Sequence, residues 1–178
     1  MTENAIIAEI PGFYKIIALQ PLRKTEGVSF DILPKNLVPK IDAIDRVIHK
    51  YKAVSPGPVG NVLEPWYMHP HQDDNLLVLQ GVRYVEIYNV AHGRIESFVI
   101  TPEKLEHNGR ILYDGPALLV WPRAVFHGIK SGESGSASIN LATHYEGIDM
   151  RTNFSIYDLD TETGKFKVIR EGQLDQSS

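Results

Sequence analysis

The sequence contains no cysteine in its 178 residues, and this absence limits the chemistry that the chain can perform. Without thiols the chain cannot form disulfides, a cysteine-ligated zinc site or a thiol nucleophile. Any metal ion would therefore have to be held by nitrogen and oxygen ligands.

Long apolar runs and a basic excess are missing as well. No stretch approaches the ~20 apolar residues that cross a bilayer, and the first residues, MTENAII, lack the basic start of a signal peptide. A net charge of -4 provides no basic surface for nucleic acid. We expect a cytoplasmic protein that binds a small molecule and neither membranes nor nucleic acid.

The residues that are present favour one small β domain. Hydrophobic residues make up 43% of the chain, enough for one core, and 11 prolines and 14 glycines are spread between short segments that alternate with a period of two. We expect a single domain in three parts: an N-terminal extension (1–45), a barrel core (46–146) and a C-terminal hairpin extension (147–178).

The alternation also predicts individual elements. Short helical turns are expected at 39–45 and 102–106, a flexible connection at 131–136, and a hairpin turn at 160–164 in which Gly164 takes positive φ. Strands are expected at 13–19, 29–33, 46–54, 66–71, 75–80, 83–89, 96–101, 111–113, 117–121, 125–130, 138–145, 153–159 and 165–170.

Two histidines stand two residues apart, just before a pair of acids and an apolar run. Residues 68–81 read MHPHQDDNLLVLQG, with His69 and His71 ahead of Asp73 and Asp74. Side chains at i and i+2 of an extended chain point to the same face, so both imidazoles could reach one ion. The spacing therefore predicts part of a metal site.

A second motif could supply a third imidazole. Residues 115–127 read GPALLVWPRAVFH, an apolar strand followed by a turn and His127. Three protein ligands on a barrel wall leave coordination positions open for water or substrate. The alternative is that His69 and His71 merely lie beside a hairpin turn, and the independent second motif favours the metal site.

Together the two segments resemble the two motifs of the cupin superfamily: His-x-His, an acid, six residues and a glycine, and later a glycine, an apolar strand and Pro-x-Gly-x-x-His. Two departures are visible, because the loop between His71 and the acid is short and Ala124 replaces the glycine of the second motif. The resemblance implies an all-β, single-domain cupin, a jelly-roll barrel or double-stranded β-helix. It also implies one divalent metal ion on His69, His71, Asp74 and His127.

The identities of the carboxylate and of the ion stay open. Asp74 keeps six residues before Gly81, as the family pattern requires, whereas Asp73 shares the parity of the two histidines; we favour Asp74. Imidazole and carboxylate ligands suit divalent iron, zinc, manganese, nickel or cobalt.

Further candidates for acid–base chemistry lie near these motifs. His144 shares parity with Asn140 on the strand after His127, and Tyr67 shares parity with His69, so His144, Asn140 and Tyr67 are the candidate catalytic residues. Inward-facing Ile139 and Leu141 would instead turn His144 outward. The histidines outside the motifs are expected on the surface: His49, His92 and His107.

Within the superfamily the two segments look like the core of the dTDP-4-dehydrorhamnose 3,5-epimerases. Those enzymes use a histidine base and a tyrosine acid without a metal, and His69 would match the base. However, Asn140 stands where the tyrosine acid should be, and Trp66 stands where the family has a substrate-binding arginine. An asparagine cannot donate a proton as a phenol does.

We therefore expect a divalent-metal-binding cupin, a small-molecule metalloenzyme of the oxygenase or isomerase/lyase type with its substrate bound at the ion inside the barrel. Two alternatives stay open: a metal-independent sugar-nucleotide epimerase-like protein, and a non-enzymatic metabolite-binding or sensor cupin. The extensions at both ends carry strand edges that need cover, and their exchange between two protomers predicts a homodimer.

Overall fold

The computed structural model describes residues 5–177, and nearly all of its regular structure is β strand. The helical elements are η1 (Lys35–Leu37), α1 (Met150–Asn153) and η2 (Gly172–Asp175). The strands are β1 (Ile6–Ile10), β2 (Tyr14–Ala18), β3 (Gln20–Thr25), β4 (Val28–Ile32), β5 (Ala43–His49), β6 (Val54–Ser55), β7 (Trp66–Met68), β8 (Gln72–Asn89), β9 (Arg94–Thr101), β10 (Lys104–His107), β11 (Arg110–Tyr113), β12 (Ala117–Trp121), β13 (Phe126–His144), β14 (Ile156–Leu159) and β15 (Phe166–Arg170).

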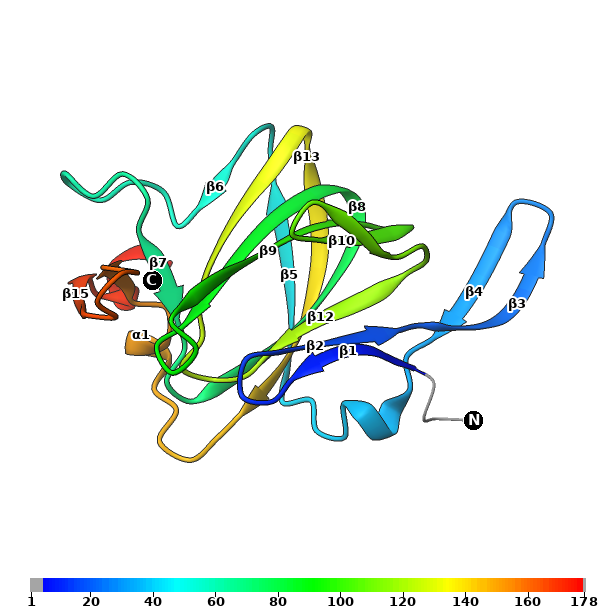
Figure 1. The fold of residues 1–178 in the computed structure, drawn as a ribbon, viewed down its shortest axis with the longest axis horizontal. Coiled ribbons are helices and arrows are strands. Elements are labelled where there is room, and N and C mark those ends of the chain that lie inside the picture. Colours follow the sequence, from blue (N-terminus) through cyan, green and yellow to red (C-terminus); the bar gives the residue numbers. More distant parts are fainter. Residues whose placement is uncertain (1–4, 178) are drawn as a thin grey trace.

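Thirteen strands form one antiparallel sheet that closes into a barrel (Figure 1). The long strands β8 and β13 pair along most of their length and curl around the barrel, while β5 pairs with the second half of β13. The N-terminal hairpin joins the sheet because β2 pairs with β12, and the C-terminal hairpin joins it because β14 pairs with β7. The hairpin of β3 and β4 is a separate two-stranded sheet that projects from the barrel.

The main hydrophobic core lies where β2, β8, β9 and β12 face one another. Strand alternation places the side chains of Val85 and Ile87 inside, with Ile16, Phe98 and Leu119 packed around them, and each of these is fully buried. This core fills one part of the barrel. The polar residues of the two histidine motifs line the remainder.

Two pairs of expected strands are continuous in the structure. Residues 75–80 and 83–89 belong to β8, which bends at Gly81, where φ is +74° and an added Cβ would lie 2.1 Å from the carbonyl oxygen of Gly135. Residues 125–130 and 138–145 likewise belong mostly to β13, so the flexible connection expected at 131–136 is wrong. Buried Ser131 and Ser136 hold that segment through a 2.7 Å hydrogen bond between their hydroxyls.

Three short elements that were expected from the local sequence differ in the structure. The helical turn expected at 102–106 is wrong, since β10 begins at Lys104 and pairs with β9. The turn expected at 39–45 is replaced by η1 at 35–37 and by the start of β5 at Ala43. The strand expected at 66–71 ends at Met68. The hairpin turn with positive φ at Gly164 is confirmed, with φ +72°.

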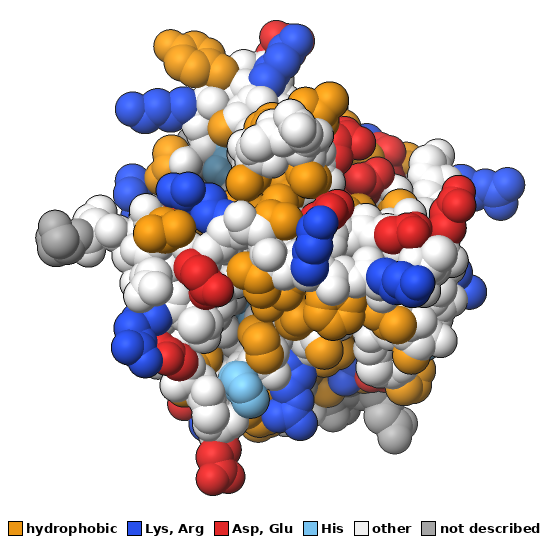
Figure 2. Space-filling view, turned by 90° about the vertical axis from the view of Figure 1, so that its left-hand side faces the viewer, with side chains coloured by type: hydrophobic (Ala, Val, Ile, Leu, Met, Phe, Trp, Pro, Cys, Tyr) orange, Lys and Arg blue, Asp and Glu red, His pale blue; other side chains and the backbone are white. Residues whose placement is uncertain are grey.

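Figure 2 shows the face on which the C-terminal hairpin lies, with apolar side chains gathered in its middle and charged side chains around them. Among the described residues, no helix is long and apolar enough to span a membrane.

Candidate active site inside the barrel

A cavity of about 320 Å³ opens inside the barrel, and three residues of the sequence motifs meet in it. His69 follows β7, Asp74 lies near the start of β8, and His127 is the second residue of β13. All three side chains are buried, with relative exposures of 3% to 4%. Antiparallel pairing of β13 with both β7 and β8 brings these distant segments together.

The reactive atoms of these residues converge on one point. His69 Nε2 lies 3.3 Å from Asp74 Oδ2, and His127 Nε2 lies 3.9 Å from the same oxygen. One candidate ligand atom from each residue lies within 4.8 Å of the others, and the two imidazole centroids are 4.8 Å apart. We call these three residues the central cluster.

Hydrogen bonds fix the orientation of both rings. His69 Nδ1 lies 2.5 Å from the carbonyl oxygen of Asn153, and His127 Nδ1 lies 3.3 Å from that of Val125. A carbonyl oxygen can only accept, so each Nδ1 carries the proton and donates it. Each Nε2 is therefore directed at the cavity, where it can accept a proton or bind an ion.

Two amides hold the carboxylate of the cluster. Gln72 Nε2 and Asn140 Nδ2 donate to Asp74 Oδ1 at 2.7 and 2.6 Å. Asn153 Nδ2 in turn donates to Gln72 Oε1 at 2.9 Å. These bonds satisfy Oδ1 and leave Oδ2 facing the two imidazoles.

Burial and nearby charges shift the pKa values of the two histidines in opposite directions. Burial disfavours a charged His69, yet the Asp74 carboxylate and the Asn153 carbonyl outweigh it and raise the pKa of His69. Burial, reinforced by His69, lowers the pKa of His127 to about 4. Burial alone would raise the pKa of Asp74, but His69 holds that pKa well below its usual range. Without a bound ion, the Asp74 carboxylate thus favours a proton on His69, while His127 stays neutral.

His71 does not belong to the central cluster, so the expectation that both histidines of the first motif share one site is wrong. Residues 69–71 lie between β7 and β8 and are not extended strand, so the i, i+2 parity argument does not apply to them. The His71 ring instead lies against Gly147, where an added Cβ would be 3.0 Å from His71 Cε1. Pro70, which lacks an N–H, separates the two histidines.

The choice between the two acids follows from their contacts. Asp74 faces the cavity, whereas Asp73 accepts hydrogen bonds from the Arg123 backbone N–H at 2.7 Å and from the Tyr145 hydroxyl at 2.6 Å. The structure thus places Asp74, the favoured acid, with the two histidines.

Two of the three candidate catalytic residues line the cavity. Asn140 contacts the central cluster, and the ring centroid of Tyr67 lies 5.9 Å from that of His127, with burial raising the pKa of Tyr67. His144 does not line the cavity; its backbone N–H donates to Asp42 near the end of β13.

Sequence reasoning missed several residues of the site. Gln72 shares strand parity with Asp74, a signal that could have identified it, whereas nothing in the sequence links Asn153 to His69 across 84 positions. His49 was expected on the surface but is buried and lines the cavity. His92 and His107 are partly buried outside the cavity; His107 Nε2 lies 2.6 Å from Glu96.

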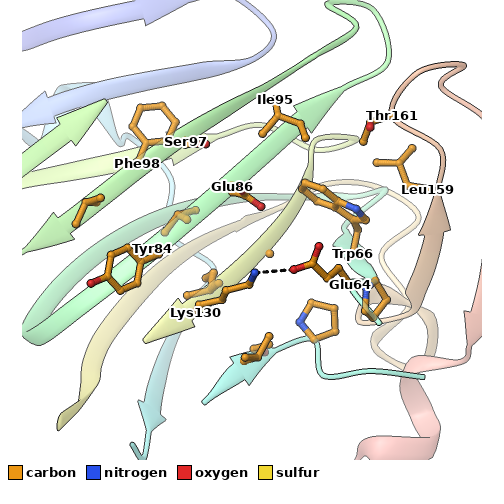
Figure 3. Close-up of a pocket in the computed structure, with 18 residues that line it drawn as sticks. Glu64, Trp66, Tyr84, Glu86, Ile95, Ser97, Phe98, Lys130, Leu159 and Thr161 are labelled. Atoms are coloured by element: carbon orange, nitrogen blue, oxygen red, sulfur yellow. Dashed lines mark hydrogen bonds and ion pairs between the residues drawn. The ribbon is translucent and has the colours of Figure 1, made fainter. Parts of the chain in front are cut away.

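A larger cavity, of about 520 Å³, lies outside the barrel (Figure 3). Its walls are the outer faces of β8, β9 and β13 and the segment leading into β7, and an exposed ion pair of Lys130 with Glu64 at 2.8 Å crosses it. No histidine of the described residues lines it. The convergent acid–base groups are therefore in the smaller, inner cavity.

Comparison with known proteins identifies the fold of this barrel. No family model matches the chain, and no curated protein matches it. Solved structures do match, and they agree on the barrel. The chain has the cupin fold.

Three of these structures are named as an epimerase or as 3,4-ketoisomerases. The rmlC epimerase of Mycobacterium tuberculosis is 11% identical, with a TM-score of 0.56 over 78% of this chain and 67% of that chain. QdtA, a sugar 3,4-ketoisomerase of Thermoanaerobacterium thermosaccharolyticum in complex with TDP, is 11% identical, with a TM-score of 0.55 over 76% and 84%. The WlaRB TDP-quinovose 3,4-ketoisomerase of Campylobacter jejuni is 15% identical, with a TM-score of 0.50 over 75% and 88%. At these identities the likeness establishes the fold.

Proposed function

We propose that this protein is an isomerase that shifts a proton between neighbouring carbon atoms of a small carbonyl compound held inside the barrel. The observation that carries the proposal is the convergence of His69 Nε2, His127 Nε2 and Asp74 Oδ2 in one buried cavity. The names of the matched structures, two ketoisomerases and an epimerase, support this class of reaction over an oxygenase.

His69 is the group best placed to move the proton. Its Nδ1 is anchored on the Asn153 carbonyl, and Asp74 Oδ2, 3.3 Å from Nε2, stabilises the imidazolium that forms when Nε2 takes a proton. Removing a proton from a hydroxyl-bearing carbon beside a carbonyl gives an enediolate. Returning that proton to the former carbonyl carbon, while the hydroxyl proton passes to the former carbonyl oxygen, moves the carbonyl by one carbon atom. Atoms and electrons balance without an added oxidant or reductant.

The same three residues support a second candidate, a divalent metal site. Metal-bound histidines usually donate their other ring N–H to a carbonyl or carboxylate, and both imidazoles of the central cluster do so. Two imidazole nitrogens and one carboxylate oxygen suit iron, zinc, manganese, nickel or cobalt. A bound ion would supply a Lewis acid for the negative charge that develops on a substrate oxygen.

Deuterium exchange tests the isomerase proposal. Free, carboxylated and TDP-linked keto sugars are incubated with the protein in D2O, and proton NMR follows the hydrogens beside the carbonyl. We expect exchange in at least one compound and a loss of at least about 100-fold in His69→Gln, in line with the usual contribution of a general base. His71→Gln is the matched control, because His71 lies on the same loop but outside the central cluster, and it should exchange at the wild-type rate.

Absence of exchange in every compound, or equal rates in His69→Gln and the wild-type protein, would contradict the proposal. Metal dependence is read separately, by elemental analysis of untagged protein and by chelation. In the metal candidate His127→Gln loses the ion and His71→Gln retains it. Equal metal content in these two variants would contradict a metal site at the central cluster.

A further inference from the structure

The inner cavity holds a second polar group, centred on Arg83 of β8. Arg83 lines the cavity, yet only 1% of it is exposed, which makes it the largest fully buried side chain of the described residues. Its guanidinium forms no ion pair with any carboxylate between residues 5 and 177. A buried cation without a counter-charge is costly, so its presence calls for an explanation.

The local hydrogen bonds satisfy only part of the guanidinium. Nε donates to Ser136 Oγ at 2.9 Å, and Nη2 donates to the carbonyl oxygen of Val47 at 3.1 Å, while Nη1 makes no hydrogen bond within the described chain. Ser136 is held by Ser131, whose hydroxyl also contacts His49 Nδ1 at 2.9 Å. All of these partners are neutral. Burial lowers the pKa of Arg83 only to about 10, so it remains charged at neutral pH.

Two more unused donors lie inside the same barrel. Trp121 Nε1 and Ser138 Oγ are buried without a hydrogen-bond partner among the described residues. Trp121 lines the cavity, with its ring centroid 5.0 Å from that of His127. Ser138 pairs directly with Val47, which lines the cavity, so its side chain lies on the inner face of the sheet. Unused donors of this kind fit a ligand rich in oxygen acceptors.

The barrel wall sets the distance between Arg83 and the central cluster. Asn140 joins Asp74 to Asp45 on β5, and Arg83 bonds to Val47 on the same strand, two residues along. Two residues of strand correspond to roughly 7 Å. The cavity's carboxylates, Asp45 and Asp74, lie at the cluster end, so the Arg83 end is the cationic one.

From this arrangement we infer that Arg83 binds the carboxylate of the substrate, so that the isomerase acts on a keto or sugar acid of about five or six carbon atoms. The carboxylate binds at Arg83 Nη1, an oxygen along the chain meets Trp121, and the reacting carbon lies at His69. The inference rests on the proposed function for the reaction, but the anion site itself does not require turnover. Full burial of Arg83 favours a compact acid over a nucleotide.

Binding measurements by calorimetry test the site directly. Glucuronate and glucose form a matched ligand pair, since they differ in a carboxylate that replaces one hydroxymethyl group. We expect glucuronate to bind at least about 10-fold more tightly than glucose, and Arg83→Gln to remove that preference. Arg110→Gln, at an exposed arginine of β11, is the matched control and should keep it. Inorganic phosphate is titrated in parallel, to separate a carboxylate site from a general oxyanion site.

Each outcome decides the inference. Equal binding of glucuronate and glucose, no binding of glucuronate, a preference for phosphate over glucuronate, or an unchanged preference in Arg83→Gln would overturn it. If Arg83→Gln fails to fold, the Nε–H signal of Arg83 is followed by NMR in the wild-type protein. A chemical-shift change with glucuronate and none with glucose would support the site. No change with glucuronate would overturn the inference. His69→Gln should retain binding while losing deuterium exchange, so failure of the isomerase proposal is distinguishable from failure of the anion site.

Discussion

The buried histidine beside Arg83 should make the stability of the protein sensitive to mild acid. His49 is 9% exposed, and burial, together with the positive charge of Arg83, lowers its pKa to about 4 from the ordinary 6.5. Above pH 6.5 the residue is neutral in both folded and unfolded chains and does not alter stability. Between pH 6.5 and about 4 the unfolded chain binds a proton that the folded protein does not.

The direction and size of the effect follow from that difference. Stability is lost as the pH falls from 6.5 towards 4, and the loss levels off below 4, where both states are protonated. The gap between 6.5 and about 4 corresponds to a total loss of about 3 kcal/mol in the free energy of unfolding. Other groups also titrate in this range: His127 adds a loss of the same sign and His69 opposes it.

A substitution isolates the contribution of His49. Glutamine at this position can still hydrogen-bond to Ser131 Oγ but does not titrate. Urea unfolding is measured at half-unit intervals between pH 4 and 7.5 for the wild-type protein and His49→Gln, and the difference between the two curves is plotted. We expect the wild-type protein to lose about 3 kcal/mol more than the variant across this range. Parallel curves would refute the assignment of His49 as a buried neutral imidazole.

Three further predictions concern the fold and its assembly. Gly81→Ala should lower the free energy of unfolding by more than about 3 kcal/mol, because the residue has positive φ and an added Cβ would lie 2.1 Å from a carbonyl oxygen. Gly93→Ala, where φ is +62° and the surrounding space is open, should lower it by only about 1 kcal/mol. Equal losses for the two variants in urea unfolding would contradict this prediction. Ala124→Gly should raise stability by up to about 1 kcal/mol, because Ala124 has φ +64°; a loss of stability would show that this turn is not strained. The edge strands β1 and β15 predict a C2 homodimer by light scattering at micromolar concentration, and a monomer would count against it.

The parts of the site that the sequence predicted depend on strand pairing. The two motifs predicted that His69, Asp74 and His127 would meet, and they do, because the strands of the two motifs, β8 and β13, are long and pair in antiparallel fashion. His71 was misplaced because the parity argument assumes extended backbone, and the chain leaves the strand after Met68.

The parts that the sequence could not predict depend on contacts between distant strands. Arg83 stands two residues after a turn-like glycine, and nothing local shows that β5 and β13 close over it. His49 is the last residue of a strand of alternating polarity, and such a position is typically exposed. In the structure, however, β13 bends at Gly135 and packs against the carbonyl oxygen of His49. Burial of this kind is a property of the closed barrel and leaves no periodic signal.

A crystal structure of the protein soaked with glucuronate tests both the isomerase proposal and the anion site at Arg83. We expect ligand density in the inner cavity, with the carboxylate at Arg83 and the other end of the sugar at His69 Nε2. Density confined to the outer cavity beside Lys130 and Glu64, or an inner cavity without ligand at saturating concentration, would contradict this expectation.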